Sequence, residues 1–253
     1  LTTCCCGGFL LAGCSTAPIT GRQQFTILPE SMINGQAISA YKQVKEKAKL
    51  IEDKDQLGPI ISVGQRIEKA IKHYFKSKNL KDPTENYDWE YILINDPKTL
   101  NAWCMPGGKI AFYSGILEVT KDENGLAAVM GHEIAHAVAS HANERMSTGL
   151  VVNFGFAALS AAAGQNPTLT QEIFLQSVGI GSELKMLQFS RKHELEADRM
   201  GLIFMAMAGY DPREAPLFWE RMAAGAGQAP PEFLSTHPGP DRRVERLKAR
   251  MPE

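Results

Sequence analysis

The sequence predicts an α+β fold that is mainly α-helical, with a small β-sheet next to a helix that carries the motif His132-Glu133-x-x-His136. Apolar residues recur at helical spacing along most of the 253-residue chain, which is the pattern of amphipathic helices. Short or alternating apolar runs that suit strands fall within residues 87–113. Because the motif follows these runs in the chain, we expect the sheet and the motif helix to be neighbours.

The composition is that of an ordinary globular protein. With 253 residues, 44% of them hydrophobic, the chain can bury a sizeable core within one large domain. The net charge of −1 gives no reason to expect nucleic acid as a partner. Lysines cluster between residues 42 and 49, but acidic residues lie among and after them. We therefore interpret this stretch as a solvated helix face rather than a binding patch.

The N-terminus carries four of the five cysteines, and only Cys104 lies in the body of the chain. This distribution excludes an internal disulfide framework and a zinc finger. Leu11-Ala12-Gly13-Cys14 resembles a lipobox at the end of a bacterial secretion signal; the alternative is a buried N-terminal strand. We expect residues 1–13 to be a signal segment and Cys14 to carry a lipid anchor. Ser15 then favours the outer membrane, so the predicted location is periplasmic.

Residues 14–29 are predicted to be a tether, followed by a single zincin-like domain over residues 30–253. Its first elements are expected to be two helices, three short strands and then the motif helix. The predicted helices cover about 30–50 and 59–76, with Pro59 in the first turn of the second helix, and the predicted strands cover 87–94, 100–105 and 109–113.

The motif helix is expected to begin at Thr120-Lys121-Asp122-Glu123, which has the form of a capping box. Residues 150–163 are strongly apolar, but 14 residues are too few to cross a bilayer comfortably. We expect a buried helix there in preference to one that touches a membrane. Three later helices are predicted. The first covers about 190–208, and the last covers about 240–250. The second opens at Asp211-Pro212, where Pro216 one turn later is expected to bend the helix or delay its start.

The motif itself predicts metal chemistry. Two histidines four residues apart on a helix stand one turn above each other and can point at one metal ion. His-Glu-x-x-His is the zincin signature, in which one helical turn supplies two zinc ligands and a general base. We therefore expect one Zn²⁺ per chain, with His132 and His136 as ligands and Glu133 as the base. On the motif alone, two histidines on a solvated helix face are the alternative.

A catalytic zinc site needs at least one further protein ligand. Ala139 and Ala142 stand where metzincins carry glycine and histidine. His141 would lie about 140° around a continuous helix from His136, so it is predicted to point elsewhere. The third ligand must then come from a distant segment of the chain.

Glu194 is the best candidate for that third ligand. Asp198 lies one helical turn later and is placed to accept the N–H of a ligand histidine, which fixes the orientation of the ring. Glu196 would lie about 200° around the helix from Glu194, so it is expected to be solvated or salt-bridged. His193 is expected to be peripheral.

Several segments together resemble a family of gluzincin metallopeptidases that includes HtpX, the CAAX prenyl proteases and periplasmic BepA-like proteins. The likeness is to the BepA-like lipoprotein branch and extends over most of the chain after Pro18. The segments that carry it are Gly131-His-Glu-Ile-Ala-His136, Ser190-Arg-x-x-Glu-x-x-Ala-Asp198, Asn101-Ala102-Trp103, Pro106-Gly107-Gly108, Ser235-Thr236-His237-Pro238 and Pro18-Ile-Thr-Gly-Arg-Gln23.

This resemblance implies a zinc endopeptidase that hydrolyses unfolded or misassembled cell-envelope proteins, with Glu133 as base on a zinc-activated water. It implies His237 and Arg243 as donors to the oxyanion. His237 occupying the open zinc position, which would make the protease latent, is an alternative. A strand at Asn101, Ala102 and Trp103 would pair with the substrate backbone, as in β-augmentation.

A second class of function is a chaperone-like assembly factor for outer-membrane proteins that uses the same scaffold mainly to bind clients. The intact Glu133 favours hydrolysis over binding alone. A purely structural zinc site is disfavoured because such sites close all four positions, usually with cysteine and histidine.

Overall fold

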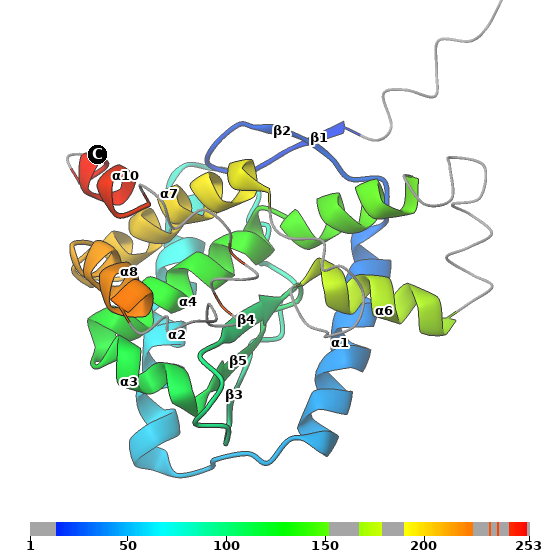
Figure 1. The fold of residues 1–253 in the computed structure, drawn as a ribbon. Helices are drawn as coiled ribbons and strands as arrows, with labels where there is room; N and C mark the ends of the chain where they lie inside the picture. Colours follow the sequence, from blue (N-terminus) through cyan, green and yellow to red (C-terminus); the bar gives the residue numbers. More distant parts are fainter. Residues whose placement is uncertain are drawn as a thin grey trace, which may run out of the picture.

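A computed structural model describes residues 14–151, 167–178, 190–224, 233, 237 and 243–251. Helix α4 (Glu123–Val138) lies at the centre (Figure 1). It packs against helices α2 (Lys54–Ser77), α7 (Arg191–Met207) and α8 (Glu214–Ala224) and against strand β4 (Ala102–Met105). The prediction of a mainly helical α+β fold, with a small sheet beside the motif helix, is confirmed. The predicted signal segment, residues 1–13, lies outside the described residues, as does most of the apolar run 150–163.

The expected tether is folded instead. Strand β1 (Cys14–Thr16) pairs antiparallel with β2 (Gln23–Phe25), and Ala17 in the connection is buried. This hairpin precedes helix α1 (Glu30–Lys47). It is ordered because side chains of its loop reach buried acidic groups on the main body, among them the ion pair between Arg22 and Glu196.

Helix α2 (Lys54–Ser77) begins five residues earlier than predicted. The Asp53 carboxylate accepts hydrogen bonds from the backbone N–H groups of Asp55 and Gln56 and so caps this earlier start. Pro59 therefore lies inside the helix, where it removes one backbone hydrogen bond. The apolar face of α2 still extends into the core over several turns, which compensates for that loss.

The three-stranded sheet separates two parts of the core. Its strand order is β3 (Glu90–Ile94), β5 (Lys109–Tyr113) and β4 (Ala102–Met105), with β3 parallel and β4 antiparallel to β5. Ala102 and Cys104 face the cluster that contains α4, whereas Trp103 faces the cluster that contains α1 and α6 (Pro167–Ser177). Strand β4 is therefore an edge strand that lies directly against the motif helix.

The start of α4 differs from the expected capping box. Thr120 ends the short helix α3 (Leu117–Thr120), which follows a 3₁₀ turn at Ser114–Ile116, and Lys121 adopts a φ of 68°. Asp122 is the N-cap and accepts a hydrogen bond from the N–H of Gly125. A Cβ at Gly125 would lie 1.9 Å from the carbonyl oxygen of Thr120, so this close approach requires glycine.

Helix α7 (Arg191–Met207) has the ends that the sequence predicts, with Ser190 as N-cap and Gly209 at a φ of 79° beyond its C-terminus. It packs against α4 through two glycines. A Cβ on Gly131 would lie 2.9 Å from the carbonyl oxygen of Gly201, and a Cβ on Gly201 would lie 3.0 Å from the backbone nitrogen of His132. Glycine at both positions therefore lets the two helices approach closely enough for their side chains to share one site.

The C-terminal elements complete this layer. Helix α8 (Glu214–Ala224) starts after Asp211-Pro212 with Pro216 in its first turn, as predicted, and α10 (Arg243–Ala249) lies within the range predicted for the last helix. Helix α6 was not predicted, since its sequence lacks a clear apolar stripe. Among the residues that the structure describes, no helix is long and apolar enough to cross a membrane.

Candidate active site

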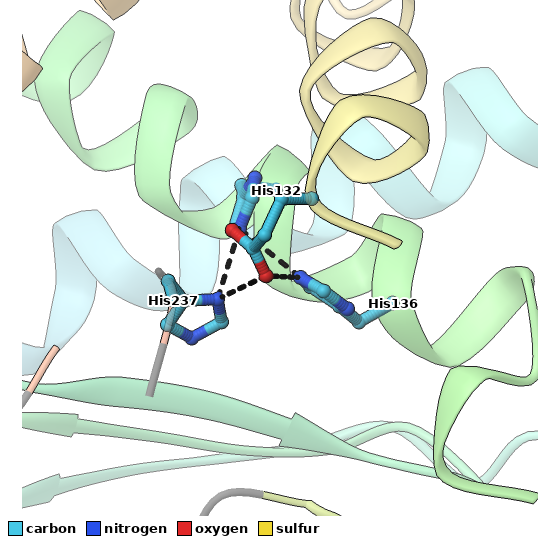
Figure 2. Close-up of side chains that lie close together, drawn as sticks. His132, His136 and His237 are labelled. Carbon is cyan, nitrogen blue, oxygen red and sulfur yellow. Dashed lines mark hydrogen bonds and ion pairs between the residues drawn. The ribbon is translucent and has the colours of Figure 1, made fainter. Parts of the chain in front are cut away.

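Four buried side chains from three parts of the chain meet in one place. His132 and His136 come from α4, Glu194 from the first turn of α7, and His237 from the segment before α10. One potential ligand atom from each lies within 4.8 Å of all the others. The three histidines point toward one another beside the sheet (Figure 2). The structure therefore brings the three predicted ligands together and adds His237 to them.

The spacing of these atoms fits a tetrahedral zinc ion. Zinc bonds of about 2.0–2.2 Å place neighbouring donor atoms of a tetrahedron roughly 3.3–3.6 Å apart. His132 Nε2 is 3.1 Å from His136 Nε2 and 3.2 Å from His237 Nδ1. Glu194 Oε1 is 3.1 Å from His237 Nδ1 and 3.4 Å from His136 Nε2. Three imidazoles and one carboxylate form a donor set that zinc prefers.

Electrostatics prepare two of the ligands for a cation. Burial opposes the ionisation of Glu194, but the adjacent His237, His132 and His136 hold its pKa well below the usual value. Burial also lowers the pKa of His136 well below its usual value, despite the nearby Glu194 carboxylate. Glu194 is therefore a carboxylate and His136 a neutral imidazole, which are the forms that bind metal.

Glu133 lies beside this cluster with its carboxyl group buried. Its Oε1 is 3.5 Å from His237 Nε2 and accepts no hydrogen bond from the described residues. Burial raises the pKa of Glu133, although the neighbouring His237 and His132 act in the opposite direction. A carboxyl group whose pKa is raised toward neutrality is suited to accept and release a proton during one reaction cycle.

Asp198 and Arg243 contact the ligands His132 and Glu194 through atoms other than those that form the metal cluster. Asp198 Oδ1 lies 3.1 Å from His132 Nδ1, on the side of the ring opposite the cluster. Arg243 donates to Glu194 Oε2 at 3.0 Å and to Asp198 Oδ1 at 3.1 Å, and its guanidinium lies 3.5 Å from the centre of the Trp219 ring. Arg243 thus contacts the two carboxylates, where it positions the ligand Glu194, and its Nη2 lies 3.1 Å from His132 Nδ1. Its expected role as a donor to the oxyanion stays a prediction.

Continuous helical geometry predicted that His141 points away from His136, but in the structure its ring contacts His136. Helix α4 ends at Val138, and Ser140 adopts a φ of 54°, which turns the chain before helical residues 141–151 begin. His141 Nδ1 consequently lies 2.8 Å from His136 Nδ1. Burial lowers the pKa of His141 to about 4, so this ring is neutral at pH 7. Neither glycine nor proline marks the turn, and the sequence therefore contains no clear signal for it.

The two neighbours of Glu194 also differ from expectation in part. Glu196 was expected to be either solvated or salt-bridged. It is salt-bridged, and its side chain is buried. Its Oε2 accepts hydrogen bonds from His141 Nε2 at 2.9 Å and from Arg22 Nε at 2.6 Å. His193 stacks on His141 with ring centres 4.3 Å apart and lies 3.0 Å from Glu144 Oε2.

The strand that was predicted to pair with substrate, β4, packs against α4, and its pairing with substrate stays a prediction. Asn101 precedes β4, whose backbone lies at the sheet edge against α4. Ala102 faces α4, but the Trp103 ring lies on the opposite face and contacts Tyr41 edge-on, with ring centres 6.2 Å apart. Trp103 therefore stabilises the sheet from the far side, and its side chain does not reach the metal cluster.

Two histidines on one helical turn, a glutamate between them and a carboxylate ligand from a second helix define a zinc metallopeptidase of the gluzincin type. The chain belongs to peptidase family M48, whose family model matches residues 62–251. This match covers α2 from residue 62 onward, the three-stranded sheet, α4, α7 and all the site residues named above except Arg22.

The chain resembles several characterised members of this group. It is 34% identical over 93% of its length to the mitochondrial metalloendopeptidase OMA1 of Schizosaccharomyces pombe, covering 66% of that protein. It is 28% identical over 97% of its length to human mitochondrial OMA1, covering 47% of it. The beta-barrel assembly-enhancing protease of Escherichia coli is 29% identical over 80% of the chain, which covers 40% of that protein. The chain thus spans less than two thirds of each relative.

These relatives correct two expectations. The Schizosaccharomyces pombe OMA1 protein matches more of the chain at higher identity than the BepA-like protease does, so the predicted BepA-like branch is supported only in part. The relatives named OMA1, from plants, fungi and animals, are all described as mitochondrial. The prediction of a periplasmic lipoprotein anchored to the outer membrane is therefore wrong.

Glu144 should make the stability of the protein depend on pH. Burial raises its pKa, but hydrogen bonds from His193 and Arg22 prevail and lower it from 4.5 to about 2. A carboxyl group with a lowered pKa in the folded state stabilises above its unfolded value and loses this effect as pH falls toward 2. We expect Glu144→Gln to lower the free energy of unfolding at pH 7, with a difference from wild type that shrinks between pH 4.5 and 2.

Urea unfolding at several pH values measures this difference. Glu46→Gln on the exposed face of α1 serves as the control and should behave like wild type. A Glu144→Gln difference that stays constant from pH 5 to 2 would show that the ion pairs of Glu144 contribute nothing.

Proposed function

We propose that this chain is a zinc-dependent endopeptidase that cleaves unfolded or extended polypeptides, with Glu133 as the general base. The observation that carries the proposal is the position of Glu133, which is buried beside a four-residue zinc site and close to an edge strand. A site for zinc storage or structure alone would not need an acid–base group at this position. When bound, zinc supplies Lewis acidity, which lowers the pKa of a water molecule and polarises the peptide carbonyl.

Glu133 accepts the proton of the attacking water and transfers it to the leaving amine. Asp198 accepts the Nδ1 proton of His132 and leaves Nε2 free to bind the metal. Arg243 holds the Glu194 carboxylate in its orientation. Substrate in extended form pairs with the outer edge of β4, and such backbone pairing selects unfolded chain with little sequence preference.

His237 is proposed to occupy the fourth zinc position in the resting protein. Its Nδ1 is 3.2 Å from His132 Nε2 and 3.1 Å from Glu194 Oε1, which is ligand spacing. Water needs this position for attack, so His237 has to leave it before cleavage begins. In the alternative role, His237 stays near Glu133 and donates from Nε2 to the oxyanion.

Cleavage of a reduced, unfolded protein such as casein, compared with a tightly folded control substrate, tests the proposal. We expect the unfolded substrate alone to be cut, a zinc chelator to abolish cleavage and added zinc to restore it. Cleavage that is insensitive to the chelator would refute a zinc mechanism. Client binding without any cleavage would instead favour the chaperone-like function.

The rate at which the His237→Ala variant cleaves the same unfolded substrate distinguishes the two roles of His237. A cleavage rate higher than that of wild type supports the resting-ligand role, and a lower rate supports the oxyanion role.

A further inference from the structure

The two histidine ligands of α4 are supported in different ways. His132 has a carboxylate, Asp198, directly behind its Nδ1. In the corresponding position His136 has an imidazole, since its Nδ1 lies 2.8 Å from the Nδ1 of His141. The nitrogen at the far end of the His141 ring, Nε2, lies 2.9 Å from Glu196 Oε2. The support of His136 therefore passes through a second imidazole before it reaches an acidic group.

Only one set of proton positions satisfies the hydrogen bonds that link His136, His141 and Glu196 when His136 binds zinc through Nε2. The proton of a neutral His136 is then on Nδ1, so Nδ1 donates and His141 Nδ1 accepts. Neutral His141 must in turn carry its proton on Nε2, where it donates to the Glu196 carboxylate. Glu196 thus fixes the tautomer of His141, and His141 fixes the tautomer and ring orientation of His136.

The N-terminal segment closes this chain of hydrogen bonds. Arg22 Nε donates to Glu196 Oε2 at 2.6 Å, and the Thr20 hydroxyl donates to Glu196 Oε1. The other end of the Arg22 guanidinium forms a bidentate pair with Glu144, at 3.0 and 2.7 Å. The Glu196 side chain is only 4% exposed, so a charge there needs such partners. Residues of the loop between β1 and β2 hold Glu196 in place for this reason.

We propose that His141 is a positioning residue for the zinc site. Thr20 and Arg22 of the N-terminal segment hold Glu196 in place, and Glu196 in turn fixes the orientation of His141. The inference rests on the proposed zinc function. It extends the site beyond the segment that the family model matches, because the loop that carries Thr20 and Arg22 precedes residue 62. The N-terminal hairpin thereby becomes part of the metal centre, with no contact to the metal itself.

Zinc affinity tests the proposal, measured by competition with a chromophoric chelator on zinc-free protein that is reloaded. Loss of a partner behind a ligand histidine typically weakens metal binding by about 10–100-fold. We expect a loss in this range for His141→Phe, which keeps a ring but removes both nitrogens. Glu196→Gln and Arg22→Met should each weaken binding by a smaller factor. The double variant of His141→Phe and Glu196→Gln should bind as His141→Phe does, because Glu196 acts through His141.

Matched controls separate positioning from general stability. His73→Phe on α2 and Arg213→Met before α8 are the same substitutions at exposed positions, and both should bind zinc like wild type. Circular dichroism and melting of the zinc-free proteins show which variants are folded. If His141→Phe does not fold, Glu196→Gln and Arg22→Met carry the test. The Co²⁺ absorption spectrum adds a readout of ligand geometry that a merely structural role would leave unchanged.

Three outcomes would refute the positioning role or the proposed function. Folded variants with the zinc affinity and Co²⁺ spectrum of wild type would refute the positioning role, whatever their melting temperatures. Wild-type protein that binds no zinc would instead refute the proposed function on which the inference rests. Equal losses in all variants, including the two exposed controls, would also reject the positioning role, because the effect would not depend on His141.

Discussion

Glu133→Gln is expected to reduce cleavage of an unfolded substrate by roughly 10²–10⁴-fold, the range typical of losing a general acid–base group. Glutamine has nearly the shape of glutamate but cannot accept the proton of the attacking water. The four zinc-binding side chains are unchanged, so the zinc content should equal that of wild type. Initial rates and metal analysis on the same preparation measure both quantities.

The matched control is Glu123→Gln at the start of the same helix, where the side chain is 51% exposed. This variant should retain the wild-type rate. If Glu133→Gln cleaved substrate at a rate within about threefold of wild type, another group would have to serve as the base. If it lost zinc together with activity, the drop in rate would report metal loss and Glu133 would have a structural role.

Arg243→Met is expected to lower the free energy of unfolding of the zinc-free protein by about 3–5 kcal/mol, the usual cost of removing one partner from a buried ion pair. Arg243 is 1% exposed and contacts both Glu194 and Asp198. Methionine retains much of the volume against Trp219, so the loss is mainly electrostatic. Urea unfolding of zinc-free protein measures the change.

Zinc should reduce this loss, because the metal compensates part of the Glu194 charge that Arg243 no longer offsets. The same unfolding experiment with zinc-loaded protein tests that expectation. Lys248→Met on the same helix is the control, since Lys248 is 56% exposed and pairs with Glu220 at the surface. An Arg243→Met effect as small as that of Lys248→Met would mean that the two carboxylates do not depend on the arginine.

Much of the metal centre follows from local rules of helix geometry. The four-residue spacing of His132 and His136 places both on one face of α4, and the same spacing relates Glu194 to Asp198 on α7. The start of α7 is likewise marked by a side chain that local chemistry identifies well, Ser190. Residue spacing within one helix can therefore be read without knowledge of the fold.

The starts of α4 and α2 show where local rules are insufficient. Thr120 and Asp122 are both acceptable caps, and the sequence favoured Thr120 because Glu123 follows three residues later. The structure uses Asp122, since Gly125 packs directly on the Thr120 carbonyl. Similarly, Asp53 caps α2 ahead of Pro59, although proline is common in the first turn. Packing chooses between local alternatives of nearly equal energy.

By itself, the sequence determined the zinc motif, its carboxylate partner and the mainly helical fold, because each depends on periodicity within a short segment. His237 and Arg243 were indicated only by family resemblance, and the contacts of Arg243 with Glu194 and Asp198 are visible only in the structure. Only the tertiary structure placed His141 behind His136, because the turn at Ser140 breaks the helical geometry from which its direction was predicted. Contacts from the N-terminal loop to Glu196 likewise depend on the path of the whole chain. No spacing rule connects residues that lie about 170 positions apart in sequence.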